Sequence, residues 1–151
     1  MPFINSLFDK YHFIFTFMGD GPMLEDVRQI IKNSKWDSRV FARGWLTLEQ
    51  KEEELSASHV FVLPSYAEGF PMSLIEAMLS GLPSICTDVG GVSDSLYDGV
   101  NGFLIPPKNI RALKEAMEFY ILNPDSLRTH SIQASKTAVQ NHDADKNCKM
   151  L

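Results

Sequence analysis

The sequence predicts an α/β fold, in which a parallel sheet carries helices on both of its faces. Short β-rich runs alternate with helical stretches along the chain, as in crossover units that join parallel strands. The expected strands are apolar without interruption, which is typical of strands buried on both faces. The chain has 151 residues, 44% of them apolar, which suits one domain with a sizeable core. We expect that domain at residues 1–140 and a polar tail at residues 141–151.

The first half of the chain contains two expected strands and three expected helices. The aromatic run at residues 13–18 is typical of a buried strand, and it ends at the turn Gly19-Asp20-Gly21-Pro22. In chain order we expect a helix at 5–11, a strand at 13–18, a helix at 24–31, a strand at 39–42 and a helix at 48–58. Because a doubly wound domain normally opens with a strand, we expect a strand and its loop to be missing upstream.

The second half continues the alternation and ends in two helices. We expect a strand at 59–63, a helix at 72–79, a strand at 83–87, a short helix at 93–97 and a strand at 103–105. Asn is a favoured N-cap, so Asn109 and Asn123 should each cap one of the two last helices. The apolar side of the first of these helices should comprise Ile110, Leu113, Met117 and Ile121.

Charge and composition argue against several classes of function. The formal net charge is −5, whereas a domain that binds nucleic acid usually has a basic excess. No apolar stretch approaches the ~20 residues needed to cross a bilayer, and no secretory signal opens the sequence. Cys86 and Cys148 lie far apart in the sequence, which excludes a disulfide framework and favours a reducing compartment.

No metal ion is expected from the sequence. The four histidines lack the spacing of metal ligands. Asp143 and Asp145, next to His142, imitate a metal-binding motif, but they lie in the polar tail, where solvated side chains are the better interpretation. Trp45 and the aromatic first strand are expected in the core rather than on a surface that stacks on a base.

The most informative segment is residues 64–78, which follow an expected strand and open an expected helix. In an open parallel sheet, ligands bind outside the carboxyl ends of the strands, and a helix N-terminus there offers unpaired N–H groups to an anion. Gly69 permits close approach of the backbone to a ligand. Glu68 and Glu76 can face the same crevice and accept hydrogen bonds from sugar hydroxyls. The segment therefore suits a sugar nucleotide.

These residues also have plainer interpretations. Glu68 can be a solvated loop residue, and Glu76 can complement the positive end of the helix dipole. The pair Gly90-Gly91 fits a strand-to-helix turn and also the close approach of a ligand, and the two uses are compatible. The order of the surrounding motifs favours the ligand interpretation for both glutamates.

The segment resembles the signature of retaining nucleotide-sugar glycosyltransferases of the GT-B fold. That signature has two glutamates separated by seven residues, as Glu68 and Glu76 are. Further segments follow the family's order and spacing over roughly residues 12–125, namely 19–22, 41–46, 60–65, 80–83, 87–92 and 98–104. The resemblance implies that the chain is one half of a GT-B fold, a Rossmann-like parallel sheet that lacks its first strand.

The resemblance also implies a role for each matching residue. Glu68 would meet the donor sugar and act in catalysis, and Glu76 would bind the ribose hydroxyls. The donor-binding residues that it implies are Gly19, Leu46, Gly69, Phe70, Met72, Ser73 and Glu76.

Most contacts between these residues and the ligand are expected to come from backbone groups. The N–H groups of Phe70, Met72 and Ser73 would face the diphosphate. The backbone of Leu46 would meet the base, and Gly19 would keep the edge of the sheet open to the ligand.

As a whole, the resemblance implies transfer of a hexose from a nucleoside-diphosphate sugar to an acceptor hydroxyl, with retention of configuration and without a metal or other cofactor. The family's Arg and Lys that neutralise the diphosphate, and its N-terminal acceptor-binding domain, have no counterpart in this sequence. We therefore expect the isolated chain to be inactive. The full enzyme is expected in the cytoplasm, with peripheral association at the inner face of the membrane as an option. The alternatives are a non-catalytic nucleotide-binding or scaffold module of the same fold and a relative of nucleotide-sugar epimerases.

Overall fold

The computed structural model of the protein describes residues 2–142. The predicted tail from residue 143 onward, with Asp143, Asp145 and Cys148, lies outside the described residues. The chain divides between Glu54 and Leu55 into two compact units, here called unit 1 and unit 2. The expectation of one domain over residues 1–140 stays a prediction.

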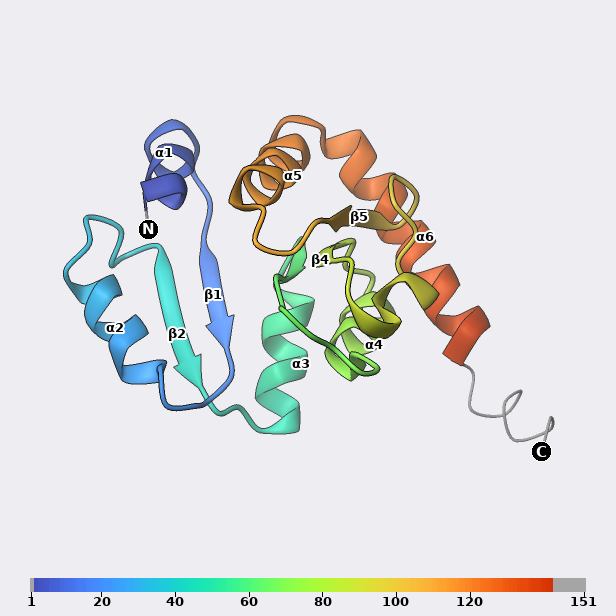
Figure 1. The fold of residues 1–151 in the computed structure, drawn as a ribbon, viewed down its shortest axis with the longest axis horizontal. Coiled ribbons are helices and arrows are strands. Elements are labelled where there is room, and N and C mark those ends of the chain that lie inside the picture. Colours follow the sequence, from blue (N-terminus) through green and yellow to red (C-terminus); the bar gives the residue numbers. More distant parts are fainter. Residues whose placement is uncertain (1, 143–151) are drawn as a thin grey trace. The chain divides into compact units, whose positions relative to one another are not determined.

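Unit 1 is a two-stranded parallel sheet with helices packed on one of its faces (Figure 1). Its elements are α1 (Pro2–Lys10), β1 (Phe15–Met18), α2 (Leu24–Lys32), β2 (Val40–Gly44) and α3 (Leu48–Ser56), which crosses into unit 2. Phe15 pairs with Val40, and both belong to an apolar cluster with Phe8 of α1 and Ile31 of α2. The Arg39 guanidinium donates to the carbonyl oxygens of Phe8 and Tyr11, at 3.0 and 3.2 Å, so a cation stabilises the C-terminal end of α1.

Unit 2 is a three-stranded parallel sheet in the order β3-β4-β5. Its elements are β3 (Phe61–Leu63), α4 (Met72–Leu79), β4 (Ser84–Thr87), the 3₁₀ helix η1 (Gly90–Asp94), β5 (Gly102–Ile105), α5 (Ile110–Leu122) and α6 (Pro124–His142). Cys86 and Leu104 pair across the sheet and pack into the apolar cluster of α4 and α6. Phe103 alternates to the other face and packs its ring against Phe119 and Tyr120 of α5. Helices therefore cover both faces of this sheet, as predicted.

The pairing of the strands differs in one respect from the expected single parallel sheet. Strands β1 and β2 form one parallel sheet and strands β3 to β5 form another, with no pairing between the two sheets among the described residues. All pairs of neighbouring strands are parallel, which agrees with the predicted α/β class. The strand expected upstream of the first helix stays a prediction.

The helix expected at residues 93–97 was wrong in place and in type. The segment forms the 3₁₀ helix η1, which begins at Gly90 and ends at Asp94. The reason is Asn101, whose fully buried side chain accepts a hydrogen bond from the Tyr97 N–H at 2.7 Å and donates to the Ser95 carbonyl at 3.0 Å. These bonds hold residues 95–97 in a turn instead of a helix.

The predicted caps of the last two helices have different outcomes. Asn109 caps α5, because its side chain accepts a hydrogen bond from the Ala112 N–H at 3.0 Å. Helix α6 begins at Pro124 as predicted. The predicted side-chain cap at its start is wrong, because the Asn123 amide donates backward to the Phe119 carbonyl at 2.8 Å and so closes α5.

The apolar side predicted for α5 is only partly right. Met117 is buried, but Ile110 is 54% exposed and Ile121 is 36% exposed. The buried residues of α5 are Ala116, Met117 and Tyr120. Tyr120 takes the inward position because its hydroxyl finds a hydrogen-bond partner inside, on His130 of α6.

His130 and Tyr120 form a buried polar pair in an aromatic cluster. His130 is 8% exposed, and its Nδ1 lies 2.8 Å from the Tyr120 hydroxyl. The ring of Phe103 packs against both, with centroids 5.6 and 5.2 Å away. Burial lowers the pKa of His130, while the Gly99 carbonyl acts in the opposite direction. Burial and the charge of Asp98 raise the pKa of Tyr120.

We expect His130 to make the protein less stable in mild acid. Above pH ~6.5, the ordinary His pKa, the ring is neutral in the folded and in the unfolded chain, so proton binding does not change the free energy of unfolding. Below that value the unfolded chain binds the proton more readily than the folded chain, whose His130 pKa is lowered. Stability therefore falls as the pH decreases toward the folded-state pKa. Urea midpoints measured between pH ~7.5 and ~5.5 should fall more steeply for the wild type than for His130→Gln.

The matched control is His59→Gln, because His59 is exposed. It should show the slope of the wild type. If the urea midpoints of the wild type and of His130→Gln fell equally with pH, protonation of His130 would not be the cause of the lower stability in acid.

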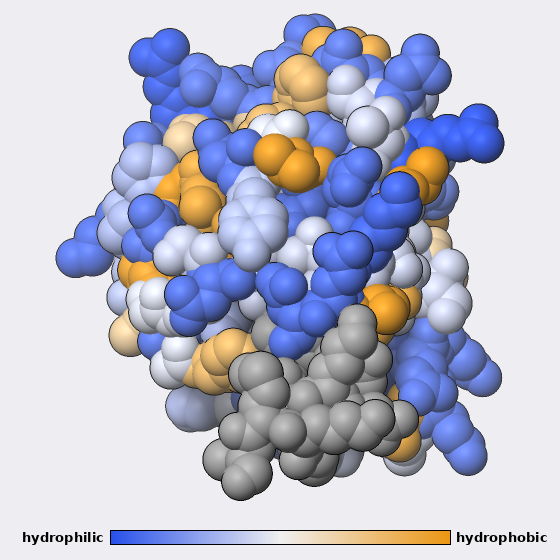
Figure 2. All heavy atoms as spheres, turned by 90° about the vertical axis from the view of Figure 1, so that its right-hand side faces the viewer, coloured by the Kyte–Doolittle hydropathy of each residue, from blue (hydrophilic) through white to orange (hydrophobic). Residues whose placement is uncertain are grey.

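One face of the protein is polar in character. Figure 2 shows this side, on which apolar side chains form separate spots among hydrophilic ones. Among the described residues no helix combines the length and apolar character that a membrane span requires.

Candidate donor-binding site

Three loops meet at the carboxyl edge of the unit 2 sheet, because its strands are parallel. Residues 64–71 join β3 to α4, and they are fixed from the neighbouring strand. The Thr87 hydroxyl at the end of β4 donates to the Ser65 carbonyl. The Gly91 N–H donates to the Gly69 carbonyl at 2.9 Å. The loop that carries the predicted glutamate thus rests on the loop that follows β4.

The close contact between these two loops explains the pair Gly90-Gly91. Gly90 has φ +56°, and a Cβ at this position would lie 1.8 Å from the Glu68 carbonyl oxygen. A Cβ at Gly91 would lie 2.9 Å from the Gly69 carbonyl oxygen. The glycines form the start of η1, as the turn interpretation expected, and they also let one backbone rest on another. This second role follows from the approach of two loops that are distant in sequence.

Glu68 and Glu76 both lie half-buried on the β3–α4 segment. Glu76 is in the second turn of α4, and Glu68 precedes that helix. Burial raises the pKa of the Cys86 thiol to about 12, and the charge of Glu68 acts in the same direction. Glu68 is therefore near the end of β4 and is not a fully solvated loop residue. The plainer interpretation of Glu76, as a partner of the helix dipole, is compatible with its place near the start of α4.

The N-terminus of α4 presents N–H groups that the helix does not use. Pro71 precedes the helix and provides no side-chain cap. The Leu74 N–H donates to the Pro71 carbonyl at 3.0 Å, so the N–H groups of Met72 and Ser73 come before the hydrogen-bonded part of the helix. Met72 is 60% exposed and Phe70 is 50% exposed, so the end of this helix faces outward. Such an end can accept an anion.

Two further predicted residues lie in unit 1. Gly19 directly follows β1, and its N–H donates to the Gly44 carbonyl at 3.0 Å at the end of β2. Leu46 is half-buried and follows the same strand. Gly19 has φ +138°, and nothing lies within 4 Å of where its Cβ would be. A glycine is therefore required at this position by the backbone conformation and not by packing.

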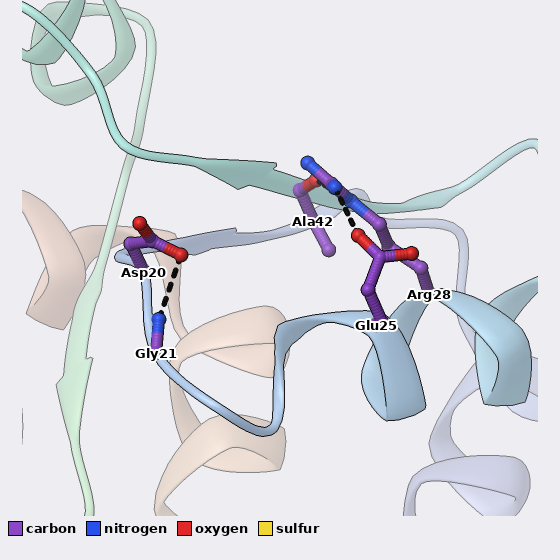
Figure 3. A network of polar contacts seen from close by, with 5 residues as sticks. All are labelled: Asp20, Gly21, Glu25, Arg28 and Ala42. Atoms are coloured by element: carbon purple, nitrogen blue, oxygen red, sulfur yellow. Dashed lines mark hydrogen bonds and ion pairs between the residues drawn. The ribbon is translucent and has the colours of Figure 1, made fainter.

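A polar network supports the turn after β1 (Figure 3). The Asp20 carboxylate accepts a hydrogen bond from the Gly21 N–H at 2.7 Å. Arg28 of α2 pairs with Glu25 at 2.6 Å and also donates from Nε to the Ala42 carbonyl of β2 at 3.3 Å. These bonds fix α2 against the edge at which Gly19 lies.

The expectation that Trp45 is buried was wrong. Trp45 is 80% exposed, because β2 ends at Gly44, whose φ of +77° turns the chain out of the strand. The aromatic residues of β1 do belong to the core, with Phe15 and Phe17 packed into the cluster of unit 1.

The predicted site residues therefore form two groups. The unit 2 group comprises Glu68, Gly69, Phe70, Met72, Ser73 and Glu76, all on one loop and the helix that follows it. The unit 1 group comprises Gly19 and Leu46 at the carboxyl edge of β1 and β2. Sequence reasoning missed the supporting hydroxyl of Thr87. A Thr that ends an apolar strand is a weak signal, and its partner could not be found without the fold.

No group of three or more His, Cys, Asp or Glu side chains able to hold a metal occurs in residues 2–142. A cavity of about 400 Å³ lies within unit 1, lined by apolar side chains such as Phe15, Val27 and Ile30. None of the predicted site residues lines it. The candidate site is thus an edge of loops and a helix end, not this apolar cavity.

Sequence comparison finds one family model over most of the chain. The model of glycosyl transferases group 1 matches residues 5–138. A candidate glycosyltransferase of teichuronic acid biosynthesis from Bacillus subtilis is 37% identical over 140 residues, which are 90% of this chain and 33% of that protein. The lipopolysaccharide 1,6-galactosyltransferase of Escherichia coli K12 is 31% identical over 121 residues, 78% of this chain and 34% of that protein. The chain spans about a third of the length of the curated relatives it matches.

Structure comparison finds the same fold in several solved proteins, one of which is a glycosyltransferase from Rickettsia africae ESF-5. The crystal structure of TarM, from S. aureus, matches with a TM-score of 0.85 and 23% identity, over 98% of this chain and 30% of that one. HepE of Anabaena, in complex with UDP, matches with a TM-score of 0.78 and 21% identity, over all of this chain and 45% of that one. The predicted α/β class and the resemblance to GT-B enzymes are confirmed.

Proposed function

Because the chain belongs to the glycosyl transferases group 1 family, we propose that it is the donor-binding part of a retaining glycosyltransferase. The donor is a nucleoside-diphosphate sugar, and a hexose passes from it to an acceptor hydroxyl. Relatives named as glycosyltransferases support the transfer of a sugar, and HepE structures that contain UDP or UDP-glucose support the nucleotide.

One observation carries the proposal. Two half-buried carboxylates, Glu68 and Glu76, flank an outward-facing helix end with unused N–H groups. The helix end suits the diphosphate, and a carboxylate on each side suits the hydroxyls of the sugar and of the ribose. We assign Glu68 to the sugar and Glu76 to the ribose. The N–H groups of Met72 and Ser73, with that of Phe70, are assigned to the diphosphate.

The remaining assignments concern unit 1 and the rest of the enzyme. Leu46 meets the base with its backbone, and Gly19 leaves the strand end open to the ligand. The acceptor hydroxyl is bound by a further domain, so the isolated chain transfers nothing. The chain binds the donor weakly, because the family's Arg and Lys that neutralise the diphosphate have no counterpart among its residues. We place the enzyme in the cytoplasm, acting at the inner face of the membrane, because several relatives are named for lipid-linked or cell-surface glycans.

These residues act mainly by electrostatic stabilisation of the charges that develop during transfer. The bond between the sugar and the diphosphate breaks, and the electron pair leaves with the diphosphate. The acceptor oxygen bonds to the same carbon, and its proton passes to the leaving diphosphate. N–H groups at the start of α4 stabilise the charge that develops on the leaving diphosphate. The Glu68 carboxylate stabilises the electron-poor sugar carbon, as carboxylates do in glycosidases.

Glu76→Ala should weaken nucleoside-diphosphate binding roughly ten- to a hundredfold. A charge-assisted hydrogen bond to a hydroxyl contributes roughly 1.5–3 kcal/mol, which corresponds to this change. The measurement is calorimetric titration of the chain with uridine, guanosine and adenosine diphosphate sugars, with the melting temperature as a check of folding.

Glu115→Ala is the matched control, since Glu115 is exposed and pairs with Arg111 on α5 at 2.7 Å. It should leave nucleotide affinity unchanged. If Glu76→Ala kept its affinity and lowered only the melting temperature, Glu76 would be a structural helix residue. Failure of the wild type to bind any of the three nucleotides would contradict the donor-binding proposal.

A further inference from the structure

Positive charge is scarce at the carboxyl edge of the unit 2 sheet. The described part of unit 2 contains five Lys and Arg residues, which are Lys108, Arg111, Lys114, Arg128 and Lys136. Four of them lie on α5 and α6, and only Lys108 lies in a loop that follows a strand. The same edge carries the carboxylates of Glu68 and Asp88. An anionic ligand at this edge would therefore meet one side-chain cation from the described part of this unit.

Lys108 is directed toward the loop that carries the predicted site. Its Nζ lies 5.7 Å from the centroid of the Tyr66 ring, within the range of a cation–π contact. Tyr66 belongs to the β3–α4 loop, two residues before Glu68, and is 73% exposed. No ion pair of Lys108 is found among residues 2–142, so its charge is not neutralised by a described carboxylate. The ammonium group thus lies beside the β3–α4 loop and is accessible to a ligand.

The backbone at Lys108 is strained for a residue of this type. Its φ is +63°, and it is the one non-glycine residue with a positive φ in the described part of the chain. The Asn109 N–H donates to the Pro106 carbonyl at 3.2 Å and closes the turn around it. Glycine would adopt this turn without strain. Strained residues gather at functional sites, where the side chain has a use that offsets the strain.

We propose that Lys108, held beside Tyr66, binds the anionic diphosphate of the ligand at this edge. This assignment rests on the proposed function, and it adds a charged side chain to the N–H groups at the start of α4. Lys108 is a binding residue in this scheme. It supplies positive charge beside the loop that carries Glu68, at an edge where a diphosphate would otherwise be repelled by the carboxylates.

The test compares two substitutions that separate charge from strain. Lys108→Gly removes the charge and relieves the backbone, so it should bind UDP about tenfold more weakly while its melting temperature rises by about a few degrees. Lys108→Gln removes the charge but keeps the strain, so it should lose the same affinity without that rise. Lys136→Gln on α6 is the matched control, because Lys136 is exposed, and it should bind like the wild type. Titration with UDP and with uridine, at low salt, gives the readout.

Uridine, which lacks phosphate, should bind the Lys108 variants as it binds the wild type. Unchanged UDP affinity in both Lys108 variants would overturn the assignment, as would an equal loss for uridine. If UDP binding is lost in Glu76→Ala but kept in the Lys108 variants, the proposed function stands and the role of Lys108 fails. If the wild type binds none of UDP, GDP and ADP, both fail together.

Discussion

Gly90→Ala is expected to destabilise the protein by about 3 kcal/mol or more and to abolish nucleotide binding. The added Cβ would lie 1.8 Å from the Glu68 carbonyl oxygen and 2.7 Å from the Glu68 carbonyl carbon. The obstacle is backbone, so no side-chain rotation relieves it, and the loop that carries Glu68 must move. The φ of +56° adds the strain of a left-handed alanine. Urea unfolding gives the loss of stability, and calorimetry with a nucleotide gives the loss of binding.

Gly99→Ala is the control that isolates the collision. Gly99 has a similar φ of +70°, but nothing lies within 4 Å of where its Cβ would be. This variant should lose only about 1 kcal/mol, the strain of the backbone alone, and should keep nucleotide binding. Similar losses for the two variants would show that the contact between the loops is not rigid.

Glu68→Gln is expected to lower kcat about a hundredfold in the longer enzyme proposed above, with a smaller change in KM. Gln keeps the shape and one acceptor oxygen but removes the negative charge. That charge acts on a sugar carbon that is electron-poor in the transition state, so its loss affects kcat more than ground-state binding. Steady-state kinetics with varied donor, together with nucleotide affinity of the variant, separates the two effects.

Asp88→Asn is the control for loss of a carboxylate at the same edge. Asp88 directly follows β4 and is exposed, and it is not assigned to the site. Its variant should keep the kcat of the wild type. A normal kcat in Glu68→Gln would show that Glu68 is not catalytic, and a change confined to KM would make it a residue that positions the donor.

Most of the elements could be predicted, because they depend on local patterns. Helix α4 has the predicted bounds of 72–79, since an apolar helix between a proline and a Ser-Gly stop is defined by its own residues. Predictions failed where a side chain bonds to a backbone group that its own sequence pattern does not reveal. Asn101 folds the segment before it into a turn, and Asn123 bonds backward instead of forward. Trp45 was misplaced because a positive φ at Gly44 removes it from the strand.

The candidate site could be located but not assembled from the sequence. The loop with Glu68 and the helix with Glu76 form one continuous segment, so their order is local information. The support from Gly90 is different, because it depends on two loops more than twenty residues apart that touch through backbone atoms. Lys108 gave no signal of its own, since a lysine in a turn is ordinarily a solvated residue.

The contact between the two loops also limits how such a protein can diversify. Because the backbone of Gly90 packs against the Glu68 carbonyl, the path of the β3–α4 loop is nearly fixed. Insertions or bulky replacements in this loop would therefore cause misfolding. Tyr66, Phe70 and Met72 project outward from that fixed path, with exposed fractions of 73%, 50% and 60%. Under the proposed function, adaptation to a new sugar would therefore proceed by exchanging these outward side chains on an unchanged backbone, one residue at a time.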